Sequence, residues 1–135
     1  MAVPFLDTNF LLRHIRQDVP EHAAKALRVL ASIEAGHLTV LTSDTVVFET
    51  VFTLERSYHV SRSDIADAVL PLVELSGIEL PGKRIYRRVF ELYLSTRLGF
   101  ADSYHVALME RLGMTEVFSL DTDFDRVPGI QRREE

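Results

Sequence analysis

Short apolar runs alternate with longer stretches of helical spacing along most of this sequence, and that alternation is the feature that most restricts its fold. Such an order is typical of parallel sheets whose strands are joined by helices. The sequence therefore predicts an α/β fold with a mainly parallel sheet of four to five strands. The expected strands are 3–6, 38–42, 78–80 and 117–120, with a short edge strand near 131–133, and the expected helices are 21–35, 43–58, 61–76, 83–98 and 101–112.

The segment 43–58 carries signals for both kinds of element. Its β-branched run Thr45-Val46-Val47 alone would favour a strand. Ser43 or Asp44 could cap a helix, and no Gly or Pro interrupts the segment. Because its length exceeds that of a usual strand, we predict a helix.

The amino-acid composition limits the classes of protein to which this chain can belong. With 135 residues, of which 47% are hydrophobic, the chain suits one compact domain, 1–135. Its net charge of -5 argues against broad polyanion binding but allows a local basic face. The absence of cysteine excludes disulfides and thiolate sites. Neither a signal-peptide pattern nor a membrane-spanning stretch is visible, so we expect a soluble, cytoplasmic protein without membrane contact.

Acidic residues follow the predicted strands. Asp7 ends the first strand, Asp121 ends the fourth with Asp123 close behind, and Asp102 opens a helix after a loop. The carboxyl ends of parallel strands lie on one edge of a sheet, where ligands bind. We therefore expect Asp7 and Asp121 to be neighbours in space.

Glu49 is the least expected acid, because valines and phenylalanines surround it and predict that it points toward a buried or half-buried surface. Several carboxylates a few ångströms apart repel one another unless a cation lies between them. Oxygen ligands without cysteine suit Mg²⁺ or Mn²⁺ better than Zn²⁺.

Each acid also has a structural interpretation. Asp102 could be a helix N-cap, Asp7 an Asx turn, and the acids from Asp121 to Asp125 a solvated turn. Glu49 could form a salt bridge with a nearby arginine. The joint pattern favours a metal site over these separate roles.

Four motifs in order, FLDTN, TSDTVVFETVF, LGFADSYHVALM and SLDTDF, resemble the PIN-domain family, in particular its VapC-type toxins from toxin–antitoxin pairs. The resemblance implies a three-layer α/β/α sandwich and a metal-dependent endoribonuclease that uses Mg²⁺ or Mn²⁺. It implies three dependable acids, Asp7, Glu49 and Asp102, a more variable fourth, Asp121, supporting polar residues Asn9 and Ser119, and a further ligand at Asp123. Whether Asp121 or Asp123 is the fourth acid stays open.

The remaining expectations concern partners. The resemblance implies an RNA substrate, a VapB-like antitoxin and a homodimer. The alternatives are a PIN-fold nuclease of RNA processing and a catalytically inactive RNA- or protein-binding module. His105 shares a stripe with apolar residues, so we expect it to be packed. Candidate RNA contacts, against the alternative of a solvated helix face, are Arg13, Arg16, Arg84, Arg87 and Arg88, with Lys83 beside them.

Overall fold

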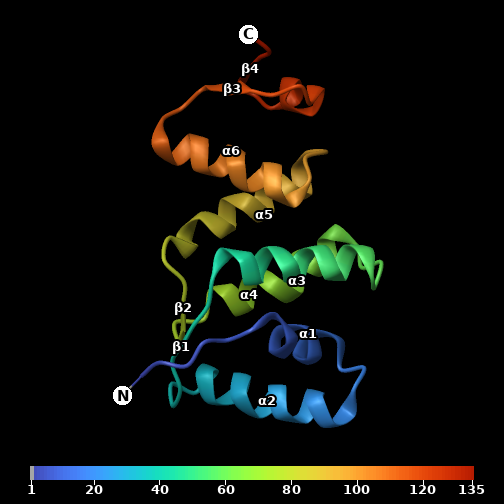
Figure 1. The fold of residues 1–135 in the computed structure, drawn as a ribbon, viewed down its shortest axis with the longest axis vertical. Coiled ribbons are helices and arrows are strands. Elements are labelled where there is room, and N and C mark those ends of the chain that lie inside the picture. Colours follow the sequence, from blue (N-terminus) through green and yellow to red (C-terminus); the bar gives the residue numbers. More distant parts are fainter. Residues whose placement is uncertain (1) are drawn as a thin grey trace. The chain divides into compact units, whose positions relative to one another are not determined.

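The computed structural model describes residues 2–135, and they form two compact units. Unit 1 ends at Lys83 and unit 2 is Arg84–Glu135. Figure 1 labels their helices and strands. Unit 1 contains α1 (Thr8–Arg16), α2 (Pro20–Glu34), β1 (Val40–Leu41), α3 (Asp44–Arg56), α4 (Arg62–Val73) and β2 (Ile78–Glu79). A 3-10 helix, η1 (Lys83–Ile85), leads into unit 2, which contains α5 (Tyr86–Ser95), α6 (Phe100–Leu112), β3 (Glu116–Phe118), η2 (Thr122–Arg126) and β4 (Gln131–Arg133).

The strands of unit 1 are short and parallel. β1 pairs with β2 in the register Val40↔Ile78, and Phe5 forms a single parallel bridge with Leu41. The expected strand 3–6 is thus reduced to one bridge, because residues 2–5 are exposed and only Leu6 is buried. The side chain of Thr42 reinforces this pairing by donating a hydrogen bond to the Leu6 carbonyl at 3.0 Å.

Serine caps fix the starts of two helices in unit 1. The Ser43 hydroxyl accepts a hydrogen bond from the amide of Val46 at 3.2 Å, and α3 begins directly after it. Ser61 caps α4 in the same way, accepting from the amide of Asp64 at 3.2 Å. The prediction of a helix after Ser43 is confirmed, since the cap and the buried face outweigh the β-branched run.

The helix α1 was missing from the sequence prediction. Thr8, Leu11 and Leu12 are buried on one side of it, and α1 packs against both α2 and α3. This spacing of buried positions is helical, but the helix is only 9 residues long and follows the apolar start directly. The core of unit 1 is built from α1, α2, α3 and the short strands, and includes Leu6, Leu11, Leu30, Ile33, Val40, Val46 and Ile78.

Aromatic rings form the interior of unit 2, where α5 packs on α6. The ring of Phe100 lies 5.1 Å from that of Phe90 and 5.4 Å from that of Tyr93, measured between centroids. α6 ends at Leu112, and its C-cap Gly113 has a left-handed φ of 72°, which favours glycine.

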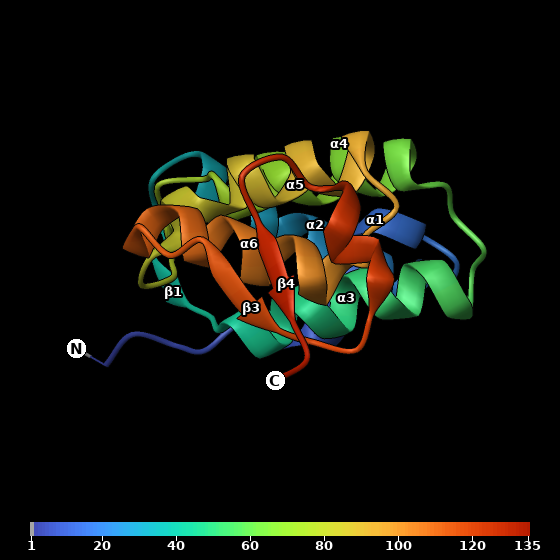
Figure 2. The ribbon, with the colours of Figure 1, turned by 90° about the horizontal axis from the view of Figure 1, so that it is seen from above.

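The strands β3 and β4 run parallel and side by side, in the register Val117↔Arg132 (Figure 2). They confirm the fourth strand and the edge strand near 131–133. The described residues therefore contain two parallel strand pairs, which agrees with an α/β fold. A continuous sheet of four to five strands and its three-layer arrangement stay predictions, because the hydrogen-bonded pairs of residues 2–135 are confined to these two pairs and the Phe5 bridge.

Candidate functional site

Asp7 lies where the first extended segment turns into α1. It occupies the N-cap position with extended backbone angles, but its side chain makes no capping hydrogen bond. Leu6 before it is buried, whereas Asp7 and Asn9 are exposed. Among the described residues, no hydrogen bond or ion pair involves the Asp7 carboxylate. Both carboxylate oxygens are therefore available to a ligand.

Glu49 projects from α3 into solvent. Val46, Val47 and Thr50 fill the buried face of this helix, and Glu49 is exposed. The expectation of a buried or half-buried Glu49 is wrong, because the buried face of the helix is formed by its valines, whereas Phe48 and Phe52 are only half-buried and lie on the side of Glu49. Its side chain instead borders a hollow of about 380 Å³ that Asp44, Thr45, Phe48 and Phe52 also line.

Asp102 lies in the first turn of α6, and its side chain is 32% exposed. The N-cap of this helix is Gly99, so the alternative role of Asp102 as an N-cap is wrong. One oxygen of Asp102 lies 3.2 Å from Nδ1 of His105, one turn further along. The imidazole can therefore fix the orientation of this carboxylate while the second oxygen stays open.

The exposure of His105 was also predicted wrongly from the sequence. Its side chain is 57% exposed, so the expectation of a packed histidine is wrong. The signal in the sequence was its separation from Asp102 by three positions, which places two side chains on the same face of a helix.

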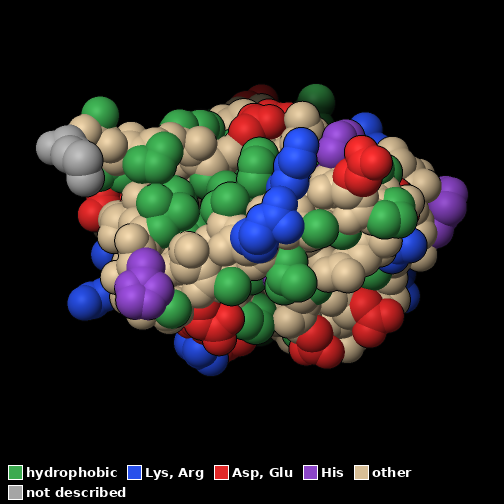
Figure 3. All heavy atoms as spheres, turned by 90° about the horizontal axis from the view of Figure 1, so that it is seen from below, with side chains coloured by type: hydrophobic (Ala, Val, Ile, Leu, Met, Phe, Trp, Pro, Cys, Tyr) green, Lys and Arg blue, Asp and Glu red, His purple; other side chains and the backbone are tan. Residues whose placement is uncertain are grey.

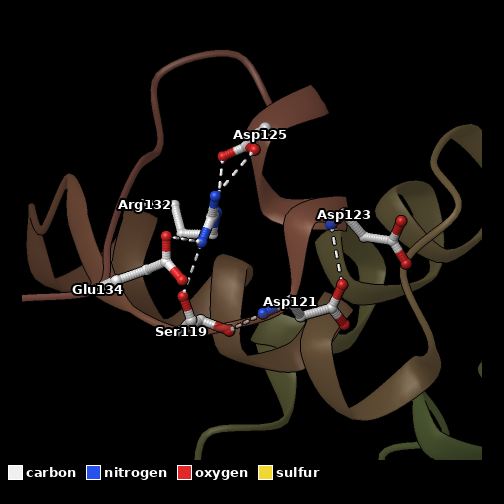
Figure 4. A network of polar contacts seen from close by, with 6 residues as sticks. All are labelled: Ser119, Asp121, Asp123, Asp125, Arg132 and Glu134. Atoms are coloured by element: carbon white, nitrogen blue, oxygen red, sulfur yellow. Dashed lines mark hydrogen bonds and ion pairs between the residues drawn. The ribbon is translucent and has the colours of Figure 1, made fainter.

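The acidic loop between β3 and β4 is ordered by its own side chains (Figure 4). The Ser119 hydroxyl accepts a hydrogen bond from the Asp121 amide at 3.0 Å, and Oδ1 of Asp121 accepts one from the Asp123 amide at 2.9 Å. One oxygen of Asp121 thus stabilises the loop by accepting this hydrogen bond, whereas the Asp123 carboxylate has no partner among the described residues. Both side chains retain oxygens for a cation.

Arg132 holds the other side of the same loop. Its guanidinium donates to both carboxylate oxygens of Asp125, at 2.9 and 3.3 Å, and to the Ser119 carbonyl at 3.1 Å. Glu134 lies 3.4 Å from it. In Figure 4 the carboxylates of Asp121 and Asp123 point away from Arg132. Asp125 is therefore neutralised by a cation of the chain itself, and Asp121 and Asp123 are not.

Several of the expected RNA contacts have partners of their own. Arg13 donates to Asp18 at 2.9 Å, and Arg16 lies over the Tyr58 ring, 4.7 Å from its centroid. Arg88 makes two hydrogen bonds to Glu110, at 2.8 and 3.0 Å, and a further contact with Glu91. Arg84 and Arg87 are exposed. Lys83 donates to the carbonyls of Leu75 and Ile78, both at 2.7 Å, and its burial lowers the pKa of its ammonium group.

The expected site residues belong to both units. Unit 1 carries Asp7, Asn9 and Glu49, and unit 2 carries Asp102, Ser119, Asp121 and Asp123. Within each unit, counting only described residues, no three His, Asp or Glu side chains are placed to bind one metal ion. The convergence of the acids stays a prediction. The donor set itself consists of carboxylates with free oxygens, which fits a hard divalent cation.

A comparison with protein families identifies the chain. The family model of the PIN domain matches residues 5–130. The chain belongs to the PIN domain family. The match includes all four expected acids, and it confirms the family inferred from the four sequence motifs.

Among solved structures, this PIN domain is similar to the Mycobacterium tuberculosis toxin VapC20, which cleaves the sarcin–ricin loop. The two chains are 25% identical, the alignment covers 90% of this chain and 92% of that chain, and the TM-score is 0.40. No curated protein matches the sequence. Among the described residues of the PIN domain, no helix has the length and apolar character needed to cross a membrane.

Proposed function

We propose that this PIN domain is an endoribonuclease that requires Mg²⁺ or Mn²⁺. The observation that carries the proposal is that the family match includes Asp7, Glu49, Asp102 and Asp121, and that each keeps at least one carboxylate oxygen open. Carboxylates that no lysine or arginine of the described residues pairs with are poorly explained as structural ion pairs. They are well explained as ligands of a cation that also meets a phosphate.

Asp7, Glu49, Asp102 and either Asp121 or Asp123 would hold the cation. When bound, the cation supplies the Lewis acidity for hydrolysis of a phosphodiester by water. The chain's own residues prepare the site: Ser119 braces Asp121, and Asn9 offers an uncharged amide that adds no repulsion. This proposal requires that acids of both units act in one nuclease domain. Variants of acids from each unit should therefore lower the same activity and the same metal affinity.

We also propose that the nuclease acts as the toxin of a toxin–antitoxin pair. The motifs that resemble VapC-type toxins support this role, and they extend over nearly the whole chain. It implies a VapB-like antitoxin, an RNA target in the cytoplasm and a homodimer. Growth arrest on expression in a bacterium, relieved by co-expression of the antitoxin, is the expected result.

The nuclease proposal is tested by incubating purified protein with total RNA in Mg²⁺, in Mn²⁺ and in EDTA. We expect cleavage only with metal, and losses of about 100-fold or more for Asp7→Asn and Asp102→Asn, since each removes a charged metal ligand. Asp67→Asn, at an exposed position on α4, is the matched control and should cleave like the parent. Cleavage in EDTA, or equal cleavage by all variants, would contradict the mechanism.

A binding measurement separates metal ligation from catalysis. Titration of Mn²⁺ followed by electron paramagnetic resonance should give weaker binding for Glu49→Gln and Asp102→Asn, which belong to different units. If the double variant loses no more Mn²⁺ affinity than the weaker-binding single variant, the two acids belong to one shared metal site. RNA binding without cleavage of any RNA would instead support the inactive binding module.

A further inference from the structure

Unit 1 contains a hollow between α1 and α2 that none of the expected acids lines. Its volume is about 420 Å³, and it is lined by Asn9, Phe10 and Arg13 from α1 and by His22, Lys25 and Ala26 from α2. The two helices pack against each other (Figure 1). In both helices the lining positions are spaced as on one helical face, so the hollow follows from the pairing of the helices. Its size lies within the range of small-molecule pockets.

The lining of this hollow is basic on a chain of net charge -5. Arg13, His22 and Lys25 contribute to it, and no acid does. Among the described residues, Lys25 and His22 have neither a hydrogen bond nor an ion pair. Figure 3 views unit 1 from the side of α2, and Lys and Arg side chains gather near the middle of this face. Such a cluster attracts an anion locally, although the whole molecule repels it.

Arg13 is the fixed member of the cluster. Its guanidinium donates to Asp18 at 2.9 Å and to the Tyr58 hydroxyl at 3.4 Å. The ion pair with Asp18 offsets the charge of Arg13, so Arg13 contributes fixed N–H donors, and Lys25 contributes the cation of the hollow that is unpaired among the described residues. Because its position is held by these contacts, little side-chain entropy is lost when an anion approaches it. Lys25 is free to move toward the same anion.

Phe10 and Asn9 add an aromatic ring and an amide to the basic lining of the hollow. Phe10 is 38% exposed, so part of its ring is open to a ligand in the hollow. Its ring can stack on a nucleobase, and the exposed amide of Asn9 can exchange hydrogen bonds with it. An aromatic face beside Arg13 and Lys25 matches the base and the phosphate of one nucleotide. An acidic peptide would use the cations but not the ring.

Two residues that line the hollow follow closely after Asp7, one of the acids of the proposed site. Asn9 and Phe10 belong to the first turn of α1, directly after Asp7 at its N-cap. We propose that the hollow is a subsite for one nucleotide of single-stranded RNA, adjacent to the phosphate that is cut. Phe10 stacks on the base, and Lys25 and Arg13 contact the phosphate. This inference rests on the proposed function, whose substrate it describes.

The subsite is tested by RNA binding in EDTA, where no cleavage is expected. The probe is a fluorescein-labelled oligouridylate of about eight nucleotides, followed by anisotropy at several salt concentrations. Lys25→Met should weaken binding and reduce the slope of log K against log salt by about 0.7, the value for one phosphate contact on a single strand. Phe10→Ala should raise the Kd about 5- to 50-fold through lost stacking, and much less on an abasic oligomer.

Two variants on α2 serve as matched controls. Arg28→Met removes an exposed cation and Leu27→Ala removes an exposed apolar side chain, both outside the hollow. Each should bind RNA like the parent. Thermal unfolding of all four variants checks that the fold is kept, and Lys25→Gln provides an uncharged polar replacement if Lys25→Met unfolds.

The outcomes separate the subsite from the nuclease. Binding that depends on Lys25 and Phe10 without any metal-dependent cleavage supports the subsite and contradicts the proposed function. Cleavage by all variants with an unchanged KM overturns the proposed subsite but supports the proposed nuclease function. Equal Kd values for parent and variants, or tighter binding of polyglutamate than of RNA, also overturn the subsite. Neither RNA binding nor cleavage overturns both.

Discussion

The aromatic interior of unit 2 allows a stability prediction of defined size. Phe100 is 1% exposed, and its ring lies within about 6.4 Å of the rings of Tyr86, Phe90 and Tyr93. Truncating a buried phenylalanine to alanine costs about 3–5 kcal/mol, and lost aromatic contacts raise the cost toward the upper end. Phe100→Ala should therefore lower the free energy of unfolding by about 4–5 kcal/mol. In a chain of this length that corresponds to roughly 10–20 °C in Tm.

Chemical denaturation followed by far-ultraviolet circular dichroism measures this loss. Phe100→Leu keeps most of the volume but loses the ring contacts, and should cost about 1–3 kcal/mol, less than Phe100→Ala. Leu94→Ala, at a side chain that is 51% exposed on α5, is the control and should change stability by about 0.5 kcal/mol or less. If Phe100→Ala cost no more than Leu94→Ala, the aromatic cluster would not be the core of unit 2. Phe100 lies two residues before Asp102, so metal binding should weaken together with stability.

Two further predictions follow from single contacts. Ser43→Ala removes the hydroxyl that caps α3 and should cost about 1 kcal/mol, seen as a lower urea midpoint with an unchanged slope; Ser63→Ala, at an exposed position in the first turn of α4, should leave the midpoint in place. Arg88 holds the pKa of Glu110 below its ordinary value. The Glu110 contribution is therefore present above about pH 4.5 and is lost as the pH falls through the depressed pKa. Because the pair is partly exposed, it amounts to less than about 1 kcal/mol. Glu110→Gln should flatten the acid limb of a stability–pH curve, and an unchanged limb would refute this role.

Local signals in the sequence predicted most helices well. Ser43, Ser61 and Gly113 mark their ends with specific backbone hydrogen bonds or a left-handed φ, and such signals act within a few residues. The helix α1 was missed because its apolar residues continue the preceding apolar run. The strands came out shorter than expected, since strand length depends on pairing partners that one segment does not specify.

The candidate site was less predictable than the fold. Glu49 was expected to be buried or half-buried because its sequence neighbours are apolar, yet only the valines among them lie on the buried face of α3, and Phe48 and Phe52 border the same open hollow as Glu49. His105 was expected to be packed, but its exposure depends on the rotation of α6 about its axis, which the sequence does not specify. The candidate acids were chosen from their order in the chain. How exposed each of them is could be seen only in the structure.

The start of α1 shows a separation of stability from activity. An aspartate at the N-cap usually bonds an amide of the first turn and contributes about 1 kcal/mol, but the side chain of Asp7 makes no such bond. The fold therefore depends little on this carboxylate. Asp7→Asn should give an inactive protein as stable as the parent, since asparagine is an equally good N-cap residue. The proposed ribonuclease could then be produced in quantity as this variant, with its surface intact for the study of bound RNA or partner proteins.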